Sequence, residues 1–406
     1  MSEQGALHPR DVTILCVSSY FKGNEFIEQC KAEGCKVLLL TVQSLLERPW
    51  ARHAIDEVFA LESFDDRAHV VASVSWLMRK HDITRLAPLD DYDVELVALL
   101  REHLRIPGMG ETTARYFRDK LAMRQRAQDH GIPVPPFVGA LNHARIAKYL
   151  DEVPGPWLIK PRSAASAVGI QKHFEKETLW KALEALGDQQ SFHVIEKMIP
   201  GDVFHVDSIT WEKQILFAEC HQYRRPLLAL TTDGGVFGTR TVPRGSVLER
   251  QLLEANRAVI KEFGIVRGVT HTELIRGEDG TIYFLETAAR VGGVHISDLV
   301  SASTGVNLWH EWAKIEVSQG KIPYVLPPRR SEYAALLVSL AKQEQPDTST
   351  YTDPEIVWRM TDNPHHVGMV LRSPDRDRIE ALMDEYEARF ANEFVAALPP
   401  PDKPLA

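Results

Sequence analysis

Strand-like and helix-like patterns alternate over residues 12–108, and this alternation constrains the fold more than any other feature of the sequence. Short apolar runs such as Val12–Ser18 and Lys36–Val42 are typical of buried strands. Between such runs, apolar residues recur at helical spacing, as in Asp65–Lys80. Because βαβα alternation implies a parallel sheet with right-handed crossovers, we predict a Rossmann-like α/β domain over residues 1–111.

Local signals predict where two helices near this domain begin. Asn24 is a favoured cap residue, and we expect it to start a helix that Gly34 stops in a left-handed conformation. Thr112 or Thr113 is expected to cap one continuous helix that ends near His130.

The pattern changes after the first domain, where longer strands and hairpin turns replace the alternation. Strands are expected at Trp157–Lys160, His193–Met198 and Phe204–Trp211. This mixture is typical of α+β packing, so we predict a second domain over residues 112–322.

A proline-rich stretch at Pro323–Pro328 marks the start of a C-terminal α+β portion, residues 323–406. The proline-rich tail from Ala396 to Ala406 is expected to be disordered. Two strands and a helix are expected before the tail, at Tyr333–Leu340, Val367–Leu371 and Arg376–Phe394.

Charge and composition exclude several classes of protein. The 406 residues carry a net charge of −9, which argues against a nucleic-acid-binding surface. Apolar runs are too short to cross a bilayer, and the polar segment before Asp11 does not match a signal peptide. The four cysteines form no Cys-x-x-Cys pair, so we expect a protein of the reducing cytoplasm.

The most informative stretch of the sequence is the predicted hairpin from Gly268 to Arg290. Asp279-Gly280 is a strong turn signal between two strand-like runs. A two-residue loop there places Glu273 directly opposite Glu286. A four-residue loop would leave the two carboxylates diagonal on one face, whereas a three-residue loop would separate them.

Two opposed carboxylates repel each other unless they share a cation. Glu273 and Glu286 offer hard oxygen ligands without a soft partner, which suits Mg²⁺ or Mn²⁺. The alternative is a pair of solvated glutamates on an exposed face, which Phe284 and Leu285 disfavour. His271 shares the face of Glu273 and is a candidate to orient a ligand or contact phosphate, although a histidine on a strand is more often structural.

Further residues have the chemistry of an anion site. Lys160 ends an apolar strand, where its charge requires a partner, and the small-residue loop Ser163–Gly169 follows at once. Arg290 precedes two glycines and is a candidate anion contact, or else a charge partner for the glutamates. The sequence lacks the motif of a P-loop NTPase, and Gly108-Met-Gly110 matches only part of a dinucleotide fingerprint, so we interpret it as a linker.

From about Val12 to Gly320, the order and spacing of these parts resemble the ATP-grasp superfamily, and most closely its L-amino-acid ligases and related carboxylate–amine ligases. Asp119-Lys120 before Gly131-Ile-Pro-Val-Pro is similar to the entry helix of that family. The resemblance makes the N-terminal part a pre-ATP-grasp domain, and places a mobile phosphate loop and a hinge within residues 157–200.

The resemblance also implies roles for single residues. Glu273 and Glu286 would be the metal ligands, and the catalytic candidates are Arg290, Lys160 and His271. Lys197 and Ile199 would read adenine through their backbone. The implied nucleotide contacts are Lys120, Lys160, Ser163, Ser166, Gly169, Glu196, Lys197, Ile199, Asp202 and His205.

Two positions depart from the family pattern. Ala288 stands where an asparagine usually supplies a third metal ligand, so the metal would depend more on phosphate and water. Val203 stands where a glutamate often holds the ribose, with Asp202 beside it.

The resemblance implies an ADP-forming ligase that uses ATP and Mg²⁺ or Mn²⁺ to join a small carboxylate and an amine, with amino acids as the expected substrates and a homodimer as the expected assembly. The alternatives are an ATP-grasp carboxylase or purine-pathway ligase, and an ATP-binding module without ligase activity. One of four arginines is a candidate for the substrate carboxylate: Arg224, Arg225, Arg240 or Arg244.

Overall fold

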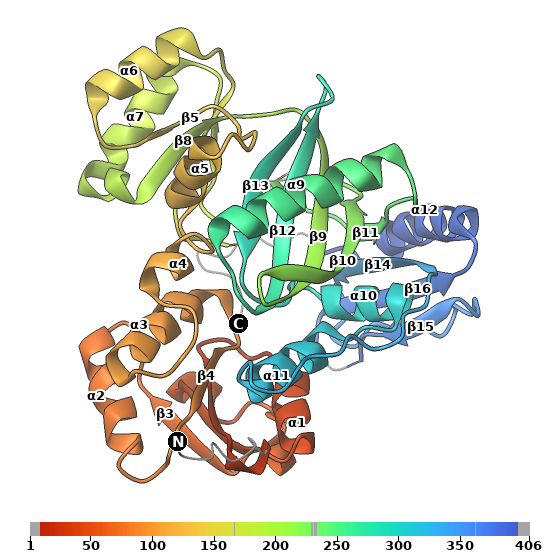
Figure 1. Ribbon diagram of the computed structural model, residues 1–406. Coiled ribbons are helices and arrows are strands. Elements are labelled where there is room, and N and C mark those ends of the chain that lie inside the picture. Colours follow the sequence, from red (N-terminus) through yellow and green to blue (C-terminus); the bar gives the residue numbers. More distant parts are fainter. Residues whose placement is uncertain (1–8, 166, 229, 231–233, 362, 397–406) are drawn as a thin grey trace.

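The computed structural model describes residues 9–165, 167–228, 230, 234–361 and 363–396 (Figure 1). Ser166, for which we predicted a phosphate contact, lies outside the described residues, as does most of the tail predicted to be disordered. Three bodies are visible in Figure 1: an N-terminal domain, a small lobe and a large sheet with its helices.

The N-terminal domain contains a four-stranded parallel sheet, as predicted, in the order β3-β2-β1-β4. Its strands are buried on both faces, because alternate residues such as Cys16 and Val17 enter two different apolar clusters. The elements are β1 (Thr13–Ser18), α1 (Asn24–Ala32), β2 (Lys36–Val42), β3 (Glu57–Leu61), α2 (Arg67–Leu77), β4 (Arg85–Pro88) and α3 (Val94–Leu104).

Gly34 follows the first helix with a φ of 95°, as predicted, but both predictions of an N-terminal cap near this domain were wrong. Gly23, in a left-handed conformation, caps α1, while the Asn24 side chain bonds the neighbouring loop at Pro49 and Ala51. The predicted single helix is two helices, α4 (Glu111–Arg115) and α5 (Lys120–Asp129). The Asp119 carboxylate accepts hydrogen bonds from two N–H groups of the first turn of α5, so it competes successfully for the cap position.

The small lobe holds a second sheet, in the order β5-β8-β6-β7, which two helices cover on one side (Figure 1). The buried side chains of these helices pack on the central strands of this sheet, for example Leu150 and Leu183 with Ile195. The elements are β5 (Phe137–Gly139), α6 (His143–Glu152), β6 (Trp157–Pro161), β7 (Gln171–His173), α7 (Lys176–Leu186) and β8 (His193–Lys197).

An eight-stranded antiparallel sheet runs through the rest of the protein, in the order β13-β12-β9-β10-β11-β14-β16-β15. Its strands are β9 (Gly201–Trp211), β10 (Gln214–Tyr223), β11 (Phe237–Thr241), β12 (Gly268–Gly277), β13 (Ile282–Ala288), β14 (Tyr333–Leu340), β15 (Ile356–Arg359) and β16 (His366–Ser373). Its helices are α9 (Val247–Phe263), α10 (Ile296–Thr304), α11 (Leu308–Ser318) and α12 (Arg376–Glu393). Short 3₁₀ helices occupy Pro9–Asp11, Gln43–Leu45, Arg52–Ala54, Asp91–Asp93 and Gly187–Phe192.

The C-terminal portion continues this sheet, because β14 pairs with β11. Two of the four arginines considered for a substrate carboxylate, Arg224 and Arg240, help to hold this portion in place. Arg224 Nε lies 2.8 Å from Glu387 Oε2, and Arg240 Nε lies 2.8 Å from Glu380 Oε1, so both are tied to α12.

The helix α11 belongs to the core of the N-terminal domain. Trp309 and Trp312 of α11 pack in one apolar cluster with Phe26 of α1. The N-terminal domain is therefore fastened to the large sheet through α11 as well as through the chain between α3 and α4.

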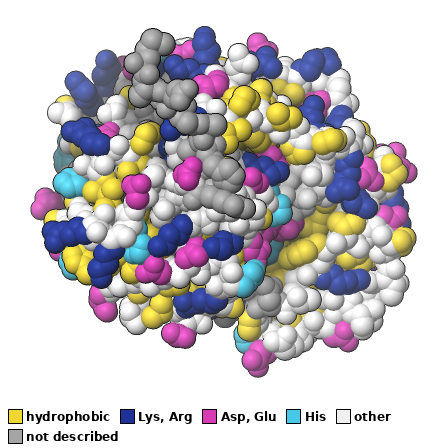
Figure 2. All heavy atoms as spheres, turned by 60° about the horizontal axis from the view of Figure 1, so that its bottom comes forward, with side chains coloured by type: hydrophobic (Ala, Val, Ile, Leu, Met, Phe, Trp, Pro, Cys, Tyr) yellow, Lys and Arg dark blue, Asp and Glu magenta, His cyan; other side chains and the backbone are white. Residues whose placement is uncertain are grey.

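On the face in Figure 2, basic and acidic side chains are interspersed. Within the described part of the chain, no helix combines the length and the apolar character needed to cross a membrane.

Candidate active site

A cavity of about 410 Å³ lies where the small lobe faces the hairpin β12–β13. It brings together five of the residues predicted from the sequence, which come from α5, β6, β8, β12 and β13. These are Lys120, Lys160, Glu196, Glu273 and Glu286. A cavity of this size is within the range that holds small-molecule ligands. We call it the large cavity.

The hairpin places Glu273 opposite Glu286, as predicted, although the predicted loop was wrong. The turn has three loop residues, since the N–H of Gly277 bonds to the carbonyl of Thr281. Leu274 pairs with Phe284, so Leu285 is an extra residue that restores the register at Glu273. Bulges of this kind occur next to active sites, where they change the direction of a side chain.

The two opposed glutamates have different surroundings. Glu273 is 9% exposed, and its Oε1 accepts a hydrogen bond of 2.8 Å from the Tyr223 hydroxyl. Burial alone would raise its pKa, but His271 and Tyr223 lower it. Glu286 is more open, with 31% of its side chain exposed, and its Oε2 lies 2.6 Å from Lys120 Nζ. The pair therefore has one fixed and one accessible carboxylate.

Both predicted phosphate lysines point into the large cavity from its walls. Lys120 Nζ also donates to the carbonyl of Ala164, at 2.7 Å. Lys160 Nζ lies 2.8 Å from Glu196 Oε2, and Arg124 Nε lies 2.9 Å from the other oxygen of Glu196. Burial opposes ionisation of Glu196, but Arg124 and then Lys160 lower its pKa to about 2. Glu196 is therefore a charged anchor for two cations.

The predicted phosphate loop lies over the large cavity and is held to the N-terminal domain. Arg118 donates to the carbonyl of Ser163, and the N–H of Ala165 lies 3.4 Å from the Tyr92 hydroxyl. The cavity is lined by Ala164, Ala165, Ala167 and Val168 of the loop rather than by Ser163 or Gly169. The loop is thus closed by contacts that the sequence alone did not predict.

The hinge after β8 forms an apolar side of the large cavity. Lys197 and Ile199 line it, together with the apolar side chains of Leu158, Ile275 and Leu285. The N–H of Lys197 is bonded to Pro136, whereas the N–H of Ile199 has no hydrogen-bond partner among the described residues. This free donor beside an apolar slot fits the edge of a planar base. Asp202 does not line the cavity, while Val203 does.

A small cavity of about 20 Å³ lies beside the large one and contains Arg290 and His271, with Lys120 and Glu286 shared between the two. Arg290 Nη1 donates to the carbonyl of Val291, and Nη2 lies 3.6 Å from Asp91 Oδ2. Among the described residues, Arg290 Nε has no hydrogen-bond partner. The guanidinium therefore keeps an N–H donor, at Nε, with which it can bind an anion.

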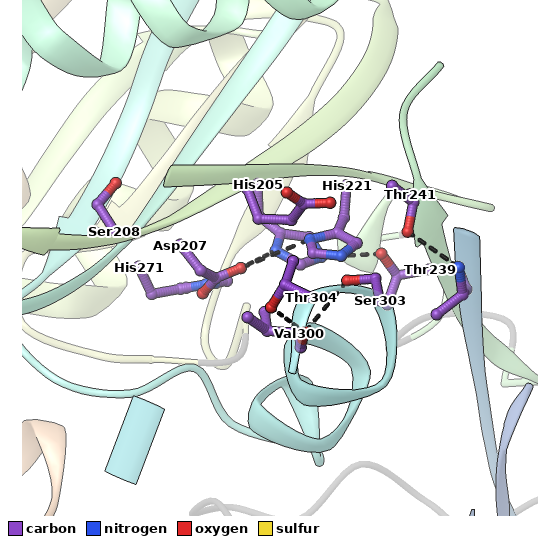
Figure 3. Close-up of polar contacts among 12 residues, drawn as sticks. His205, Asp207, Ser208, His221, Thr239, Thr241, His271, Val300, Ser303 and Thr304 are labelled. Atoms are coloured by element: carbon purple, nitrogen blue, oxygen red, sulfur yellow. Dashed lines mark hydrogen bonds and ion pairs between the residues drawn. The ribbon is translucent and has the colours of Figure 1, made fainter. Parts of the chain in front are cut away.

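Behind Glu273 lies a buried polar cluster of His205, Asp207, His221 and His271, which Figure 3 shows. Asp207 accepts from both neighbouring imidazoles: its Oδ2 lies 2.7 Å from His205 Nδ1, and its Oδ1 lies 2.8 Å from His271 Nδ1. His271 Nε2 then faces Glu273 Oε1 at 3.8 Å. Burial would lower the pKa of His271, but Asp207 raises it to about 9. Asp207 thereby fixes the ring that stands next to Glu273.

His205, for which we predicted a nucleotide contact, does not line the large cavity. The residue is fully buried, and its second ring nitrogen lies 2.8 Å from Thr239 Oγ1. On β9, Phe204 and Val206 point to one side and enter an apolar cluster, whereas His205 points to the other side, where Asp207 and Thr239 hold it.

Sequence reasoning missed four residues of the site: Asp91, Arg118, Arg124 and Tyr223. Arg124 offered a signal, because an arginine one helical turn after Lys120 points to the same side of α5. Asp91 and Tyr223 come from elements far away in the sequence, and no local pattern marks either of them or Arg118.

Comparison with known proteins gives three findings. Residues 117–294 match the model of an ATP-grasp domain. The L-arginine-specific L-amino acid ligase of Bacillus subtilis is 23% identical over 299 residues, which cover 72% of each chain. The crystal structure of an L-amino acid ligase from Bacillus licheniformis superposes with a TM-score of 0.73 at 18% identity, over 94% of this chain and 98% of that one.

The fold is also similar to that of N5-carboxyaminoimidazole synthetase from Staphylococcus aureus. The TM-score is 0.72 at 17% identity, and the similarity covers 93% of this chain and 97% of the other. Similarity at this level of identity shows the fold, and it does not choose between the chemistries of these relatives.

Proposed function

The chain carries an ATP-grasp domain in residues 117–294, and from this premise we propose that it is an ADP-forming ligase that joins the carboxylate of one amino acid to the amine of another. The observation that carries the proposal is the pair of opposed carboxylates, Glu273 and Glu286, which line one cavity together with Lys120 and Lys160. The sequence similarity to an amino acid ligase supports amino acids as substrates.

The residues fit a magnesium ion. Glu273 and Glu286 supply hard oxygen ligands, and Mg²⁺ usually completes its shell with water and substrate phosphate. Lys120 Nζ lies 2.6 Å from Glu286 Oε2, so a cation already accompanies this carboxylate. Ala288 offers no third protein ligand, so phosphate and water would supply more of the shell. The ion would withdraw charge from the phosphates during transfer.

In the first proposed step, a substrate carboxylate oxygen attacks the γ-phosphorus of ATP. The bond from this phosphorus to the bridging oxygen breaks, which gives an acyl phosphate and ADP. Such a transfer needs positioning and charge neutralisation more than covalent help from the protein. Lys120 and Lys160 would neutralise the phosphates, and Arg290 would hold the transferred group in the small cavity.

In the second proposed step, the amine nitrogen attacks the acyl carbon. The carbon–oxygen bond to phosphate breaks, inorganic phosphate leaves, and the nitrogen loses a proton. The closed loop over the large cavity would keep water away from the acyl phosphate, which would otherwise hydrolyse without product.

A matrix of amino acids as carboxylate and amine donors tests the proposal. Each pair is incubated with ATP and Mg²⁺, phosphate release is followed, and product masses are measured. We expect phosphate release that requires both substrates and a product that has lost one water relative to them. Release that requires bicarbonate would favour the carboxylase alternative, whereas ATP binding without release for any pair would favour a binding module.

A further inference from the structure

A third cavity, of about 270 Å³, lies between the N-terminal domain and the large sheet, and it shares no lining residue with the two cavities above. Its walls come from β4, the end of α3, the linker 107–113, the turn 264–268 and α11. We call it the interdomain cavity. No part of the proposed ligase reaction uses it.

The walls of the interdomain cavity are basic. Three arginines line it, Arg85, Arg101 and Arg267, whereas Glu316 is the one acidic residue among the described lining residues. Arg85 and Arg101 are buried, with 5% and 6% exposed. Arg267 is more open and is paired with Glu212, at 2.7 Å from its Nε.

One carboxylate, that of Glu316, lies near the two buried guanidiniums, and only Arg101 forms an ion pair with it. Arg101 Nη2 lies 3.7 Å from Glu316 Oε1, while Arg85 Nε bonds to the backbone carbonyl of Glu316 at 3.1 Å. Arg101 also donates to the carbonyl of Leu86, and Arg85 also donates to the carbonyl of Pro107. Burial lowers the pKa of both arginines, and Glu316 offsets this only in part. One buried positive charge is therefore left without a carboxylate, which is costly in a protein interior.

A polar atom of this cluster has no partner. Arg101 Nε is buried and makes no hydrogen bond to any described residue. An unsatisfied donor on a buried cation is a second sign, independent of the charge count, that the cavity is suited to a negatively charged occupant.

The Gly108-Met-Gly110 segment, which we interpreted as a linker, forms part of this site. Gly108 has a φ of 155°, and a Cβ there would lie 2.6 Å from Arg101 Nε. Glycine at this position lets the linker backbone pack against the guanidinium. The linker and Arg101 thus form one surface of the cavity.

We propose that the interdomain cavity binds a small anion with a phosphate or carboxylate group, held by Arg85 and Arg101 of the N-terminal domain and Arg267 of the large sheet. Its volume lies below the range typical of larger organic ligands, so the occupant is a compact ion rather than a nucleotide. Because its ligands come from two bodies, the anion stabilises their relative placement. It also lies next to Ala289, whose neighbour Arg290 lines the small cavity.

Calorimetric titration of the full-length protein tests this proposal, without ATP or Mg²⁺ and at constant ionic strength. Inorganic phosphate and citrate are the probes, and chloride is the control for ionic strength. We expect saturable binding of at least one probe, and preference for phosphate or citrate identifies which of the two groups is recognised. Absence of saturable binding by both probes up to about 20 mM would overturn the proposal.

Variants locate the binding. Arg101→Gln and Arg267→Gln are each expected to weaken it by about tenfold or more, because each removes a charge-assisted contact. Arg257→Gln, on the exposed side of α9, is the matched control and should bind as the wild type does. If Arg101→Gln fails to fold, Arg267→Gln still tests the proposal. About a third of the Arg267 side chain is exposed, so its replacement should not disrupt the core.

A further variant separates this site from the large cavity, where phosphate is a product of the proposed reaction. Lys160→Met should leave binding of the probe unchanged. If Lys160→Met abolishes binding while Arg101→Gln and Arg267→Gln retain it, the anion binds in the large cavity and the proposal is wrong. Since no turnover is measured, a failed ligase assay does not affect this result.

Discussion

Two polar regions meet at Glu273, and they are built in opposite ways. In the large cavity, Lys120 and Lys160 are held by protein oxygens next to open space, and Glu286 is partly exposed. In the histidine cluster, the Asp207 carboxylate is fully buried, with an imidazole bonded to each of its oxygens. A phosphate can replace the partners of the lysines, whereas nothing can replace those of Asp207 without opening the core. The first region is therefore suited to exchange ligands, and the second to hold one glutamate still.

The largest expected effect is at the residue shared by the two regions. Glu273→Gln should lower phosphate release at least about 1,000-fold, because the metal loses a charged ligand in a site where electrostatic stabilisation dominates. Phosphate release under saturating ATP is the measurement. Glu278→Gln, in the exposed turn of the same hairpin, should remain active. Retention of a tenth of the activity by Glu273→Gln would remove this residue from the metal site.

A change confined to the wall of the large cavity should act on nucleotide binding. Lys160→Met is expected to raise the KM for ATP about 50-fold, because a charge-assisted contact to phosphate is lost. The free energy of unfolding should change little, since Arg124 still neutralises Glu196 in this variant. Steady-state kinetics measure the effect, with the exposed Lys148→Met as control. An unchanged KM would show that Lys160 serves only to anchor Glu196.

A change confined to the histidine cluster should act on stability and on kcat instead. Asp207→Asn is expected to lower the free energy of unfolding by about 2 kcal/mol, because both imidazoles lose a charged partner in the core and one of them also loses its acceptor oxygen. We expect kcat to fall about tenfold with little change in the KM for ATP, since His271 would no longer be held beside Glu273.

Urea unfolding and steady-state kinetics measure these two effects, and the exposed Asp82→Asn is the control. If Asp207→Asn raised KM and left stability unchanged, the contrast between the two regions would fail.

The smallest expected effect depends on pH. The pKa of Glu196 is about 2 in the folded protein, below its ordinary value of 4.5, so its contribution to stability is present above pH 4.5 and is lost as the pH falls towards 2. Between pH 7 and pH 4, the wild type should lose about 0.8 kcal/mol more stability than Glu196→Gln. Urea unfolding at the two pH values measures this difference. Equal losses would show that the fold does not keep Glu196 charged.

The parts of the fold that depend on local pattern were predictable. The strands of the N-terminal sheet were predicted nearly to the residue, because long apolar runs such as Lys36–Val42 allow no other burial. The caps at Gly23 and Asp119 were not, since several residues near a helix start can compete for the same N–H groups. Local sequence signals therefore predict where a helix or strand lies better than they predict which residue caps a helix.

The site was predictable only in part, because local sequence signals do not define every contact within it. The opposition of Glu273 and Glu286 was predicted correctly from a wrong loop, because the bulge at Leu285 offset the longer turn, and no sequence rule places such a bulge. The bond from Asp207 to His271 requires that β9 pair with β12, and these residues are 64 positions apart. The pairing of distant strands is set by the whole sheet. The side-chain contacts between such strands therefore cannot be predicted from local sequence patterns.

One measurement tests the central claim most directly, that Glu273 and Glu286 together hold a divalent ion beneath ATP. It is a crystal structure of the full-length protein with Mn²⁺ and a non-hydrolysable ATP analogue, with anomalous data for manganese. The account predicts an anomalous peak within about 2.5 Å of a carboxylate oxygen from each glutamate, beside the phosphates. A bound nucleotide without manganese at these carboxylates, or with the two side chains turned to other partners, would contradict it.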